Sequence, residues 1–77
     1  MVIKILGTGC PKCRKLEANA KEALKEVGLY ATIEKVTDLE DIMKYNIVIT
    51  PGFVVNEEVK SSGKLLSVEQ IKKIITS

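Results

Sequence analysis

The sequence lacks histidine and tryptophan, and its only aromatic residues are two tyrosines and one phenylalanine. Without histidine, the chain has no access to the commonest general base and metal ligand of proteins. Basic residues are scattered and the net charge is only +2, so the phosphate-neutralising patch of a nucleic-acid-binding protein is absent. The apolar run at residues 1–6 is too short for a signal peptide or a membrane span. We therefore expect no nucleic-acid partner, no membrane association and a cytoplasmic location.

Cysteine is also scarce, because the chain has only Cys10 and Cys13. Seventy-seven residues, 45% of them hydrophobic and 29% charged, are typical of one small globular domain over residues 1–77. In a reducing cytoplasm a cysteine pair is more often catalytic or metal-binding than structural. A bridge across so short a loop would add only about 2 kcal/mol of stability in the chain-entropy model. The pair is therefore interpreted first as a chemical device.

Hydrophobic periodicity predicts seven elements in the order β-α-β-α-β-β-α. The first half of the chain should form a strand at 2–6, a long helix from Pro11 to a stop at Gly28, and a strand at 30–36. A short helix should follow a Thr37–Glu40 capping box and end near Asn46, and a hairpin with strands at 52–55 and 59–61 should turn at Asn56–Glu57. The last helix should follow a second capping box at 67–70, with Leu66 and Ile71 as a hydrophobic staple. A helix joins the first two strands, which should therefore be parallel, whereas the last two form an antiparallel pair. The expected fold class is α/β, with a four-stranded mixed sheet and three helices.

The cysteine pair opens the long helix in the order Cys10, Pro11, Lys12, Cys13. Pro11 fits the first helical position, which makes Cys10 the N-cap. The unpaired N–H groups of that turn and the positive end of the helix dipole favour a thiolate, and Lys12 adds positive charge. Cys13 begins the apolar stripe of the helix, whereas Cys10 lies on the loop side. We therefore assign Cys10 as the attacking nucleophile and Cys13 as the resolving thiol.

The predicted chemistry is thiol–disulfide exchange. Cys10 would attack a disulfide of a partner protein, and Cys13 would then displace the partner and leave a Cys10–Cys13 disulfide. No cofactor is needed for this half-reaction. The partners would be disulfide-containing proteins and either a reductase or a small-thiol electron donor. No heptad pattern is present, so we expect a monomer.

Along its whole length the chain resembles the thioredoxin superfamily, most closely the small thioredoxin- or glutaredoxin-like redox-active disulfide proteins of archaea and bacteria. The resemblance rests on residues 7–13 after the first strand, on residues 47–51 before the third strand, and on Gly63 before the last helix. It implies a minimal thioredoxin-like fold. It also implies a cis Thr50–Pro51 bond opposite the cysteines, with the main chain of Thr50 presented to an extended substrate; a trans turn proline is the alternative. Thioredoxins keep a buried acid behind the resolving cysteine, whereas the first strand here carries Lys4.

A soft-metal site is the alternative reading of the cysteine pair. Structural zinc needs four ligands, which two cysteines without histidine do not supply within one chain. Two thiolates suffice for Cu(I), and the copper-chaperone domain also places a Cys-x-x-Cys pair between its first strand and first helix. The break at Thr50–Pro51 and the capped last helix favour the redox interpretation, since the copper-chaperone domain ends in a strand.

Overall fold

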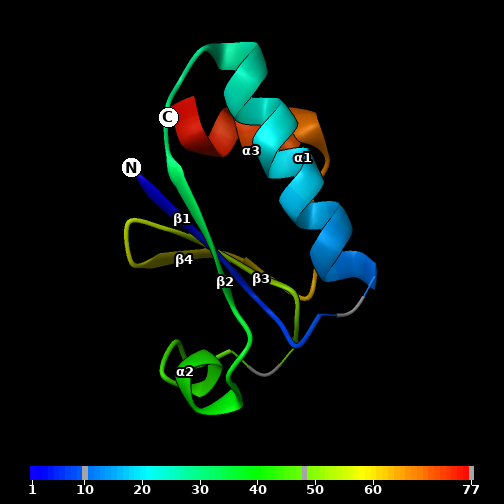
Figure 1. Ribbon diagram of the computed structural model, residues 1–77, viewed down its shortest axis with the longest axis vertical. Coiled ribbons are helices and arrows are strands. Elements are labelled where there is room, and N and C mark those ends of the chain that lie inside the picture. Colours follow the sequence, from blue (N-terminus) through cyan, green and yellow to red (C-terminus); the bar gives the residue numbers. More distant parts are fainter. Residues whose placement is uncertain (10, 48, 77) are drawn as a thin grey trace.

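The computed structural model of the protein describes residues 1–9, 11–47 and 49–76. It contains seven elements in the predicted order, shown in Figure 1. They are β1 (Val2–Leu6), α1 (Pro11–Val27), β2 (Thr32–Val36), α2 (Leu39–Met43), β3 (Gly52–Val55), β4 (Glu58–Ser62) and α3 (Val68–Thr76). The predicted α/β class, with a four-stranded sheet and three helices, is confirmed.

The four strands form one mixed sheet in the order β2-β1-β3-β4. β1 and β2 run parallel, with Ile5 opposite Lys35, and the helix α1 connects them. β1 and β3 are antiparallel, and Leu6 at the end of β1 pairs with Gly52 at the start of β3. β3 and β4 complete the sheet as an antiparallel hairpin with an irregularity between Phe53 and Val54. The two central strands therefore bring the end of β1 and the start of β3 to the same edge of the molecule.

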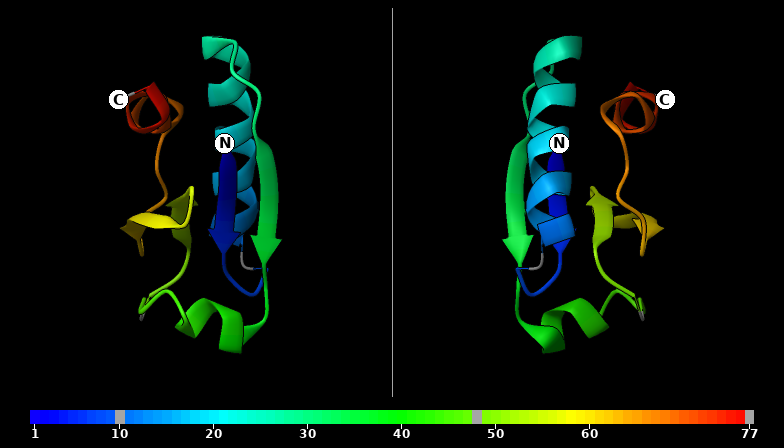
Figure 2. Two further views of the ribbon diagram at one scale, coloured as in Figure 1. Left: turned by 90° about the vertical axis from the view of Figure 1, so that its left-hand side faces the viewer. Right: turned by 90° about the vertical axis from the view of Figure 1, so that its right-hand side faces the viewer.

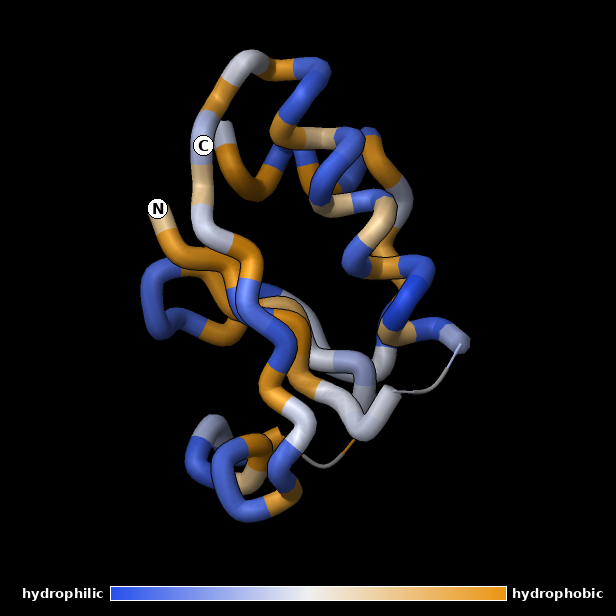
Figure 3. Tube along the Cα trace, viewed as in Figure 1, coloured by the Kyte–Doolittle hydropathy of each residue, from blue (hydrophilic) through white to orange (hydrophobic). Residues whose placement is uncertain are grey.

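The alternation of side chains along β1 and β3 divides the core between the two faces of the sheet. The larger cluster joins the sheet to α1 and α3, and it contains Ile3, Ile5, Leu16, Phe53 and Ile71, all at most 2% exposed. The smaller cluster, Leu6, Ile42 and Val54, joins the other face to α2. Figure 2 shows α1 running along β1 and β2, with α2 at the opposite end of the sheet from α3. The hydropathy colours of Figure 3 change repeatedly along α1, as expected of a helix with one buried face.

Local sequence signals explain the ends of the two longer helices. α1 begins at Pro11, and after its last residue Gly28 adopts a left-handed conformation with φ of 71°. Before α3, the Ser67 Oγ accepts a hydrogen bond from Gln70 N at 3.2 Å, and Gln70 Oε1 accepts one from Ser67 N at 2.9 Å. This reciprocal pair is the predicted capping box. Leu66 and Ile71, the predicted staple, are both buried in the larger cluster.

Three predicted boundaries are wrong. β2 begins at Thr32 and not at residue 30, because the first hydrogen bond between β2 and the first strand joins Thr32 N to the carbonyl of Met1. Tyr30 lies beyond the N-terminal end of β1 and is 98% exposed. The N-cap of α2 is Asp38, which has an extended backbone and accepts a hydrogen bond from Glu40 N at 2.9 Å, so Thr37 forms no capping box. α2 ends at Met43 and is followed by a turn through Asn46, which has a positive φ of 59°.

The hairpin turns at Asn56 and Glu57, as predicted, and its second strand is longer than expected, at Glu58–Ser62. Both turn residues have positive φ, 50° and 67°, the conformation of a tight type I′ hairpin turn. Two contacts link the turn to β1, since Asn56 N donates to the carbonyl of Val2 at 2.8 Å and Val2 N donates to Asn56 Oδ1 at 2.9 Å. These bonds stabilise a turn whose second residue is not the preferred glycine.

Lys4 connects this hairpin to α2 across the face of the sheet opposite α1. Its ammonium forms an ion pair with Glu57 and donates to the Tyr45 hydroxyl at 3.0 Å, and that hydroxyl donates to Glu57 Oε2 at 3.0 Å. The same ammonium lies 5.7 Å from the centroid of the Tyr45 ring. The hydrogen bonds from Lys4 and Tyr45 hold the pKa of the Glu57 carboxyl below its ordinary value, and the carboxylate raises the pKa of Lys4.

Among the residues that the structure describes, no helix has both the length and the apolar composition that crossing a membrane requires.

The Glu57→Gln variant should lower the thermal unfolding temperature at pH 7, because it removes the carboxylate that Lys4 and Tyr45 bind. The pKa of Glu57 is lower in the folded protein than its ordinary value of 4.5, so its contribution is complete above that value and is lost as the pH falls through the folded-state pKa. The difference in unfolding temperature between the wild type and the variant should therefore shrink as the pH falls below about 4.5.

Glu58→Gln is the matched control, because Glu58 forms an ion pair with the nearby Lys60 at an exposed position. Such a pair contributes little stability. Thermal unfolding followed by circular dichroism between pH 3 and pH 7 checks the prediction. Equal unfolding temperatures of the Glu57→Gln variant and the wild type at pH 7 would contradict it.

Candidate functional site

The loop at residues 7–9 turns the chain from the end of β1 to the start of α1. Gly7 N donates to the carbonyl of Val36 at 2.9 Å, so the pairing of β1 with β2 extends one residue beyond the strands. Gly9 has a φ of 90°, a conformation that glycine adopts without strain. The helix then begins at Pro11, the first helical position predicted for it. Cys10, the predicted N-cap and nucleophile, lies outside the described residues.

Cys13 occupies the buried side of the first turn of α1. Only 6% of the residue is exposed, and it belongs to the larger core cluster together with Leu16, one turn further along. This placement agrees with the predicted helical phase. Pro11 and Lys12 are exposed. The burial of Cys13 leaves one side of its sulfur in contact with the end of β1.

The contact is with Gly7, and it requires that residue 7 have no side chain. A Cβ atom built on Gly7 would overlap the Cys13 Sγ and would lie 3.4 Å from the Cys13 Cβ. The same position is 3.8 Å from the Thr50 Cβ. Cys13 and Thr50 therefore both lie around the space that a side chain of residue 7 would occupy, and the absence of that side chain lets them approach.

Thr50 and Pro51 reach this point because the next residue, Gly52, pairs with Leu6 at the end of β1. The Thr50–Pro51 peptide bond is cis, the isomer that the resemblance implies, and Pro51 is fully buried. Gly63 N donates to the carbonyl of Pro51 at 2.9 Å, which fixes the segment from its other side. Four predicted site residues, Pro11, Cys13, Thr50 and Pro51, thus belong to segments that converge on the end of β1.

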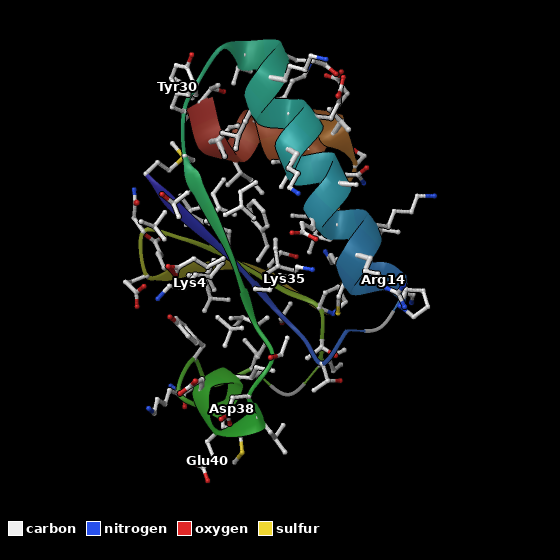
Figure 4. The ribbon with its side chains drawn as sticks, in the orientation of Figure 1. Lys4, Arg14, Tyr30, Lys35, Asp38 and Glu40 are labelled. Atoms are coloured by element: carbon white, nitrogen blue, oxygen red, sulfur yellow. The ribbon has the colours of Figure 1, made fainter. Side chains whose placement is uncertain are left out.

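The charge around the start of α1 is positive. The first turn contains no acidic residue, and Lys12, Arg14 and Lys15 are all exposed there. Beside Cys13 the protein has a small pocket of about 200 Å³, lined among others by Cys13, Arg14, Lys35 and Thr37. Figure 4 shows Arg14 at the first turn of α1 and Lys35 directed from β2 toward that helix.

Sequence reasoning missed two residues of this site. Gly7 entered the sequence analysis only as part of the segment at residues 7–13, although a glycine directly after a buried strand can also mark a close approach of another segment. Lys35 is the one charged residue of the alternating set Ala31, Ile33 and Lys35, and the other two pack on the larger core cluster. A charge on the core-facing side of a strand was the signal that could have identified it.

The sequence was compared with known proteins. The thioredoxin domain family matches residues 1–76 of the chain. A protein named thioredoxin from Methanothermobacter thermautotrophicus is 43% identical over 76 residues, which are 99% of each chain. A second thioredoxin, from Methanocaldococcus jannaschii, is 43% identical over 77 residues, all of this chain and 88% of that protein. The chain belongs to the thioredoxin family. It is accordingly a thioredoxin-like redox protein, and its general activity is that of an oxidoreductase.

The packing of Cys13 against Gly7 can be tested by substitution of the glycine. The Gly7→Ala variant should push the Cys13 sulfur out of its position against β1, because the added methyl group and the sulfur need the same space. We expect a loss of stability of about 1–3 kcal/mol, the usual effect of overpacking. We also expect faster alkylation of Cys13 by iodoacetamide, measured by mass spectrometry in a Cys10→Ser background.

Gly28→Ala is the control for general loss of stability. Gly28 has a φ of 71°, so alanine is strained there, but a Cβ at this position meets nothing within 4 Å. This variant should be destabilised without faster alkylation of Cys13. Equal alkylation rates in the Gly7→Ala variant and its parent would show that Gly7 does not hold the thiol.

Proposed function

We propose that this thioredoxin-family protein is a protein-disulfide oxidoreductase that works through a Cys10–Cys13 dithiol/disulfide couple. The observation that carries the proposal is the packing of Cys13 against Gly7, beside Thr50 and Pro51 and at the start of α1. A thiol in this position is buried and attached to a rigid helix, as a resolving thiol requires. Cys10 precedes it by three residues, a spacing that allows a disulfide without large backbone movement.

In the proposed cycle the Cys10 thiolate attacks one sulfur of a partner disulfide and releases the other sulfur as a thiol. Cys13 then attacks the Cys10 sulfur of the mixed disulfide, which forms the Cys10–Cys13 bond and releases the partner with two electrons gained. A reductase or a small-thiol donor returns the two electrons to the protein. No cofactor takes part in the exchange.

The electrostatics at the start of α1 support the nucleophilic role of Cys10. The first helical turn directs its unpaired N–H groups toward the N-cap position, and it carries Lys12 and Arg14 without any carboxylate. Both features stabilise an anion at residue 10 relative to the neutral thiol. The cationic charge also attracts acidic segments of a partner protein.

An apolar groove next to Thr50 supports a protein as the substrate. It has a volume of about 430 Å³ and is lined by residues of α2 and the segment after it, including Leu39, Met43, Ile47 and Thr50. The side chains of Leu39 and Met43 are more than 60% exposed, as is Ile49 beside the groove. An extended segment of the partner that pairs with the main chain of Thr50 would place its neighbouring side chains in this groove.

We also propose a cytoplasmic location and a monomeric state, as the sequence suggests. The soft-metal alternative has no support from the family or from the relatives, which are named thioredoxins. Within the described residues there is no group of three or more histidine, cysteine, aspartate or glutamate side chains that could hold a metal ion.

The two cysteines should respond differently to substitution by serine. Cys10→Ser should abolish the reduction of insulin disulfides by the protein in the presence of dithiothreitol, because the nucleophile is lost. Cys13→Ser should accumulate a covalent mixed disulfide with a partner, because the resolving step is blocked, and this adduct is measured by mass spectrometry under non-reducing conditions.

Two results would contradict this assignment. Full multi-turnover activity of the Cys13→Ser variant would exclude Cys13 as the resolving thiol. Tight Cu(I) binding by the wild type together with no reduction of insulin would favour the metal carrier over the oxidoreductase.

Met43→Gln should weaken the binding of protein substrates through the groove. Removing one exposed apolar side chain from an interface should raise the KM for insulin about fivefold, which corresponds to about 1 kcal/mol and to partial burial of the Met43 side chain in the complex. The kcat with a small neutral disulfide should be unchanged, because a small molecule does not reach the groove. Steady-state kinetics with both substrates measures the two effects.

Tyr30→Ser is the matched control, since Tyr30 is 98% exposed and lies at the opposite end of the molecule from α2 (Figure 4). This variant should keep the wild-type KM for both substrates. The same KM for insulin in the Met43→Gln variant and the wild type would remove the groove from the proposed docking surface.

A further inference from the structure

The pocket beside Cys13 contains two cationic side chains and lacks any acid. Arg14 lines it from the first turn of α1, Lys35 from the end of β2, and Thr37 from the segment after β2. Among the described residues that line the pocket, none carries a carboxylate. Its volume of about 200 Å³ is enough for water, which could thus reach the otherwise buried Cys13.

Lys35 is held over this pocket by an ion pair with α1. In the parallel register of β1 and β2, Lys35 lies opposite Ile5, whose side chain belongs to the core under α1. The Lys35 ammonium is 3.4 Å from Glu17 Oε1, and Glu17 lies one helical turn after Cys13. The side chain of Glu17 is only 16% exposed, so the pair orients Lys35 along the helix face that carries Cys13.

Lys4, the lysine of β1, lies on the opposite face of the sheet from this pocket. Lys4 alternates with Ile3 and Ile5 along β1, and its ammonium binds Glu57 and Tyr45 on the side of α2. The charged residues that line the described part of the pocket with Cys13 are therefore Arg14 on its own helix and Lys35 on β2, whose half-exposed side chain pairs with Glu17. This environment is cationic next to the sulfur.

We propose that Lys35, held by Glu17 and assisted by Arg14, is a positioning residue that stabilises the thiolate of Cys13 in the resolving step. The inference rests on the proposed function. Burial disfavours a thiolate, and a cation nearby favours it, so the two cations offset the cost of ionising a thiol that is 94% buried in the core. Thioredoxins keep a buried acid behind the resolving cysteine, and in this protein the two cations would take over part of the role of that acid.

The step balances without any further reagent. The proton of the Cys13 thiol passes to water in the pocket, and the sulfur electron pair forms the bond to the Cys10 sulfur. The bond between Cys10 and the partner sulfur breaks, and the partner leaves as a thiolate that takes up a proton from solvent. Lys35 stays protonated throughout, so its role is electrostatic.

The test follows the two halves of a single turnover separately. The reduced protein is mixed with 2,2′-dithiodipyridine, a neutral disulfide that the cations do not attract. Release of the first pyridinethione reports attack by Cys10, and release of the second reports the resolving attack by Cys13. Stopped-flow absorbance gives both rates between pH 6 and pH 10.

Lys35→Met should slow the second release about tenfold at pH 7, because the Cys13 thiolate loses a nearby cation, and the difference should shrink as the pH rises and more of the thiol ionises in both proteins. The first release should be unchanged. Lys35→Arg should restore the second rate to within about twofold of the wild type, since it keeps the charge and the partner Glu17.

Lys21→Met is the matched control, because Lys21 also pairs with Glu17, at 3.7 Å, but does not line the pocket. It should leave both releases unchanged. A second release in Lys35→Met within twofold of the wild type at every pH, or an equal slowing in Lys21→Met, would overturn the proposal. Failure of the proposed function looks different, since the wild type itself would then release no second pyridinethione.

Discussion

The sulfur of Cys13 lies where a side chain of residue 7 would have to be, and the arrangement of the site follows from this contact. Because Gly7 has no Cβ, the first turn of α1 packs directly on the end of β1. Because Leu6 pairs with Gly52, the same backbone segment is approached from the other strand by Thr50. A Cβ on Gly52 would in turn meet the side chains of Ile47 and Leu6. Two glycines, one directly after β1 and one at the start of β3, thus allow a helix and a loop to meet at one edge of the sheet.

The two faces of the sheet contribute differently to this edge. On one face the larger core cluster fixes α1 by burial of apolar side chains, an interaction that is strong but non-directional. On the other face a small apolar cluster is supplemented by the hydrogen-bonded group of Lys4, Tyr45 and Glu57. This group joins the hairpin to the turn that follows α2, and that turn leads to Thr50. The segment before Thr50 is therefore joined to the sheet partly by a polar contact between distant segments, whereas Cys13 is held by packing.

Periodicity and caps were sufficient to predict the order of elements, because the apolar stripe of α1 and the Ser67–Gln70 pair are local patterns with one strong interpretation. The errors fell where two neighbouring residues could do the same task. Thr37 and Asp38 can both cap a helix, and only the extended backbone of Asp38 decides between them. The start of β2 depends on where its pairing with the N-terminal end of β1 begins, which no local sequence pattern indicates. The structure brings Cys13 and Thr50 together as expected, while the geometry of Cys10 lies outside the described residues.

Gly7 and Lys35 were missed because their roles come from tertiary contacts. Residue 7 is glycine on account of a sulfur six positions later, and Lys35 faces the core side because the strand register places it opposite Ile5. In a single sequence, Lys35 is recognisable only as a charged residue within an otherwise apolar alternating set. Both residues lie beside Cys13, which the local pattern had already identified as a candidate. The sequence thus located the candidate thiol more readily than the residues packed around it.

On the proposed mechanism, the cations beside Cys13 would affect the equilibrium of the Cys10–Cys13 couple as well as the rate of the resolving step. A charge that stabilises a thiolate stabilises the reduced protein relative to the Cys10–Cys13 disulfide, which carries no charge, and so makes the couple more oxidising. Arg14 and Lys35 act in this direction, and no carboxylate lines the described part of the pocket to oppose them. On the proposed mechanism, the same two side chains that speed the resolving step also reduce its driving force. The ion pair of Lys35 with Glu17 moderates both effects, because it partly neutralises the ammonium without removing it from the pocket.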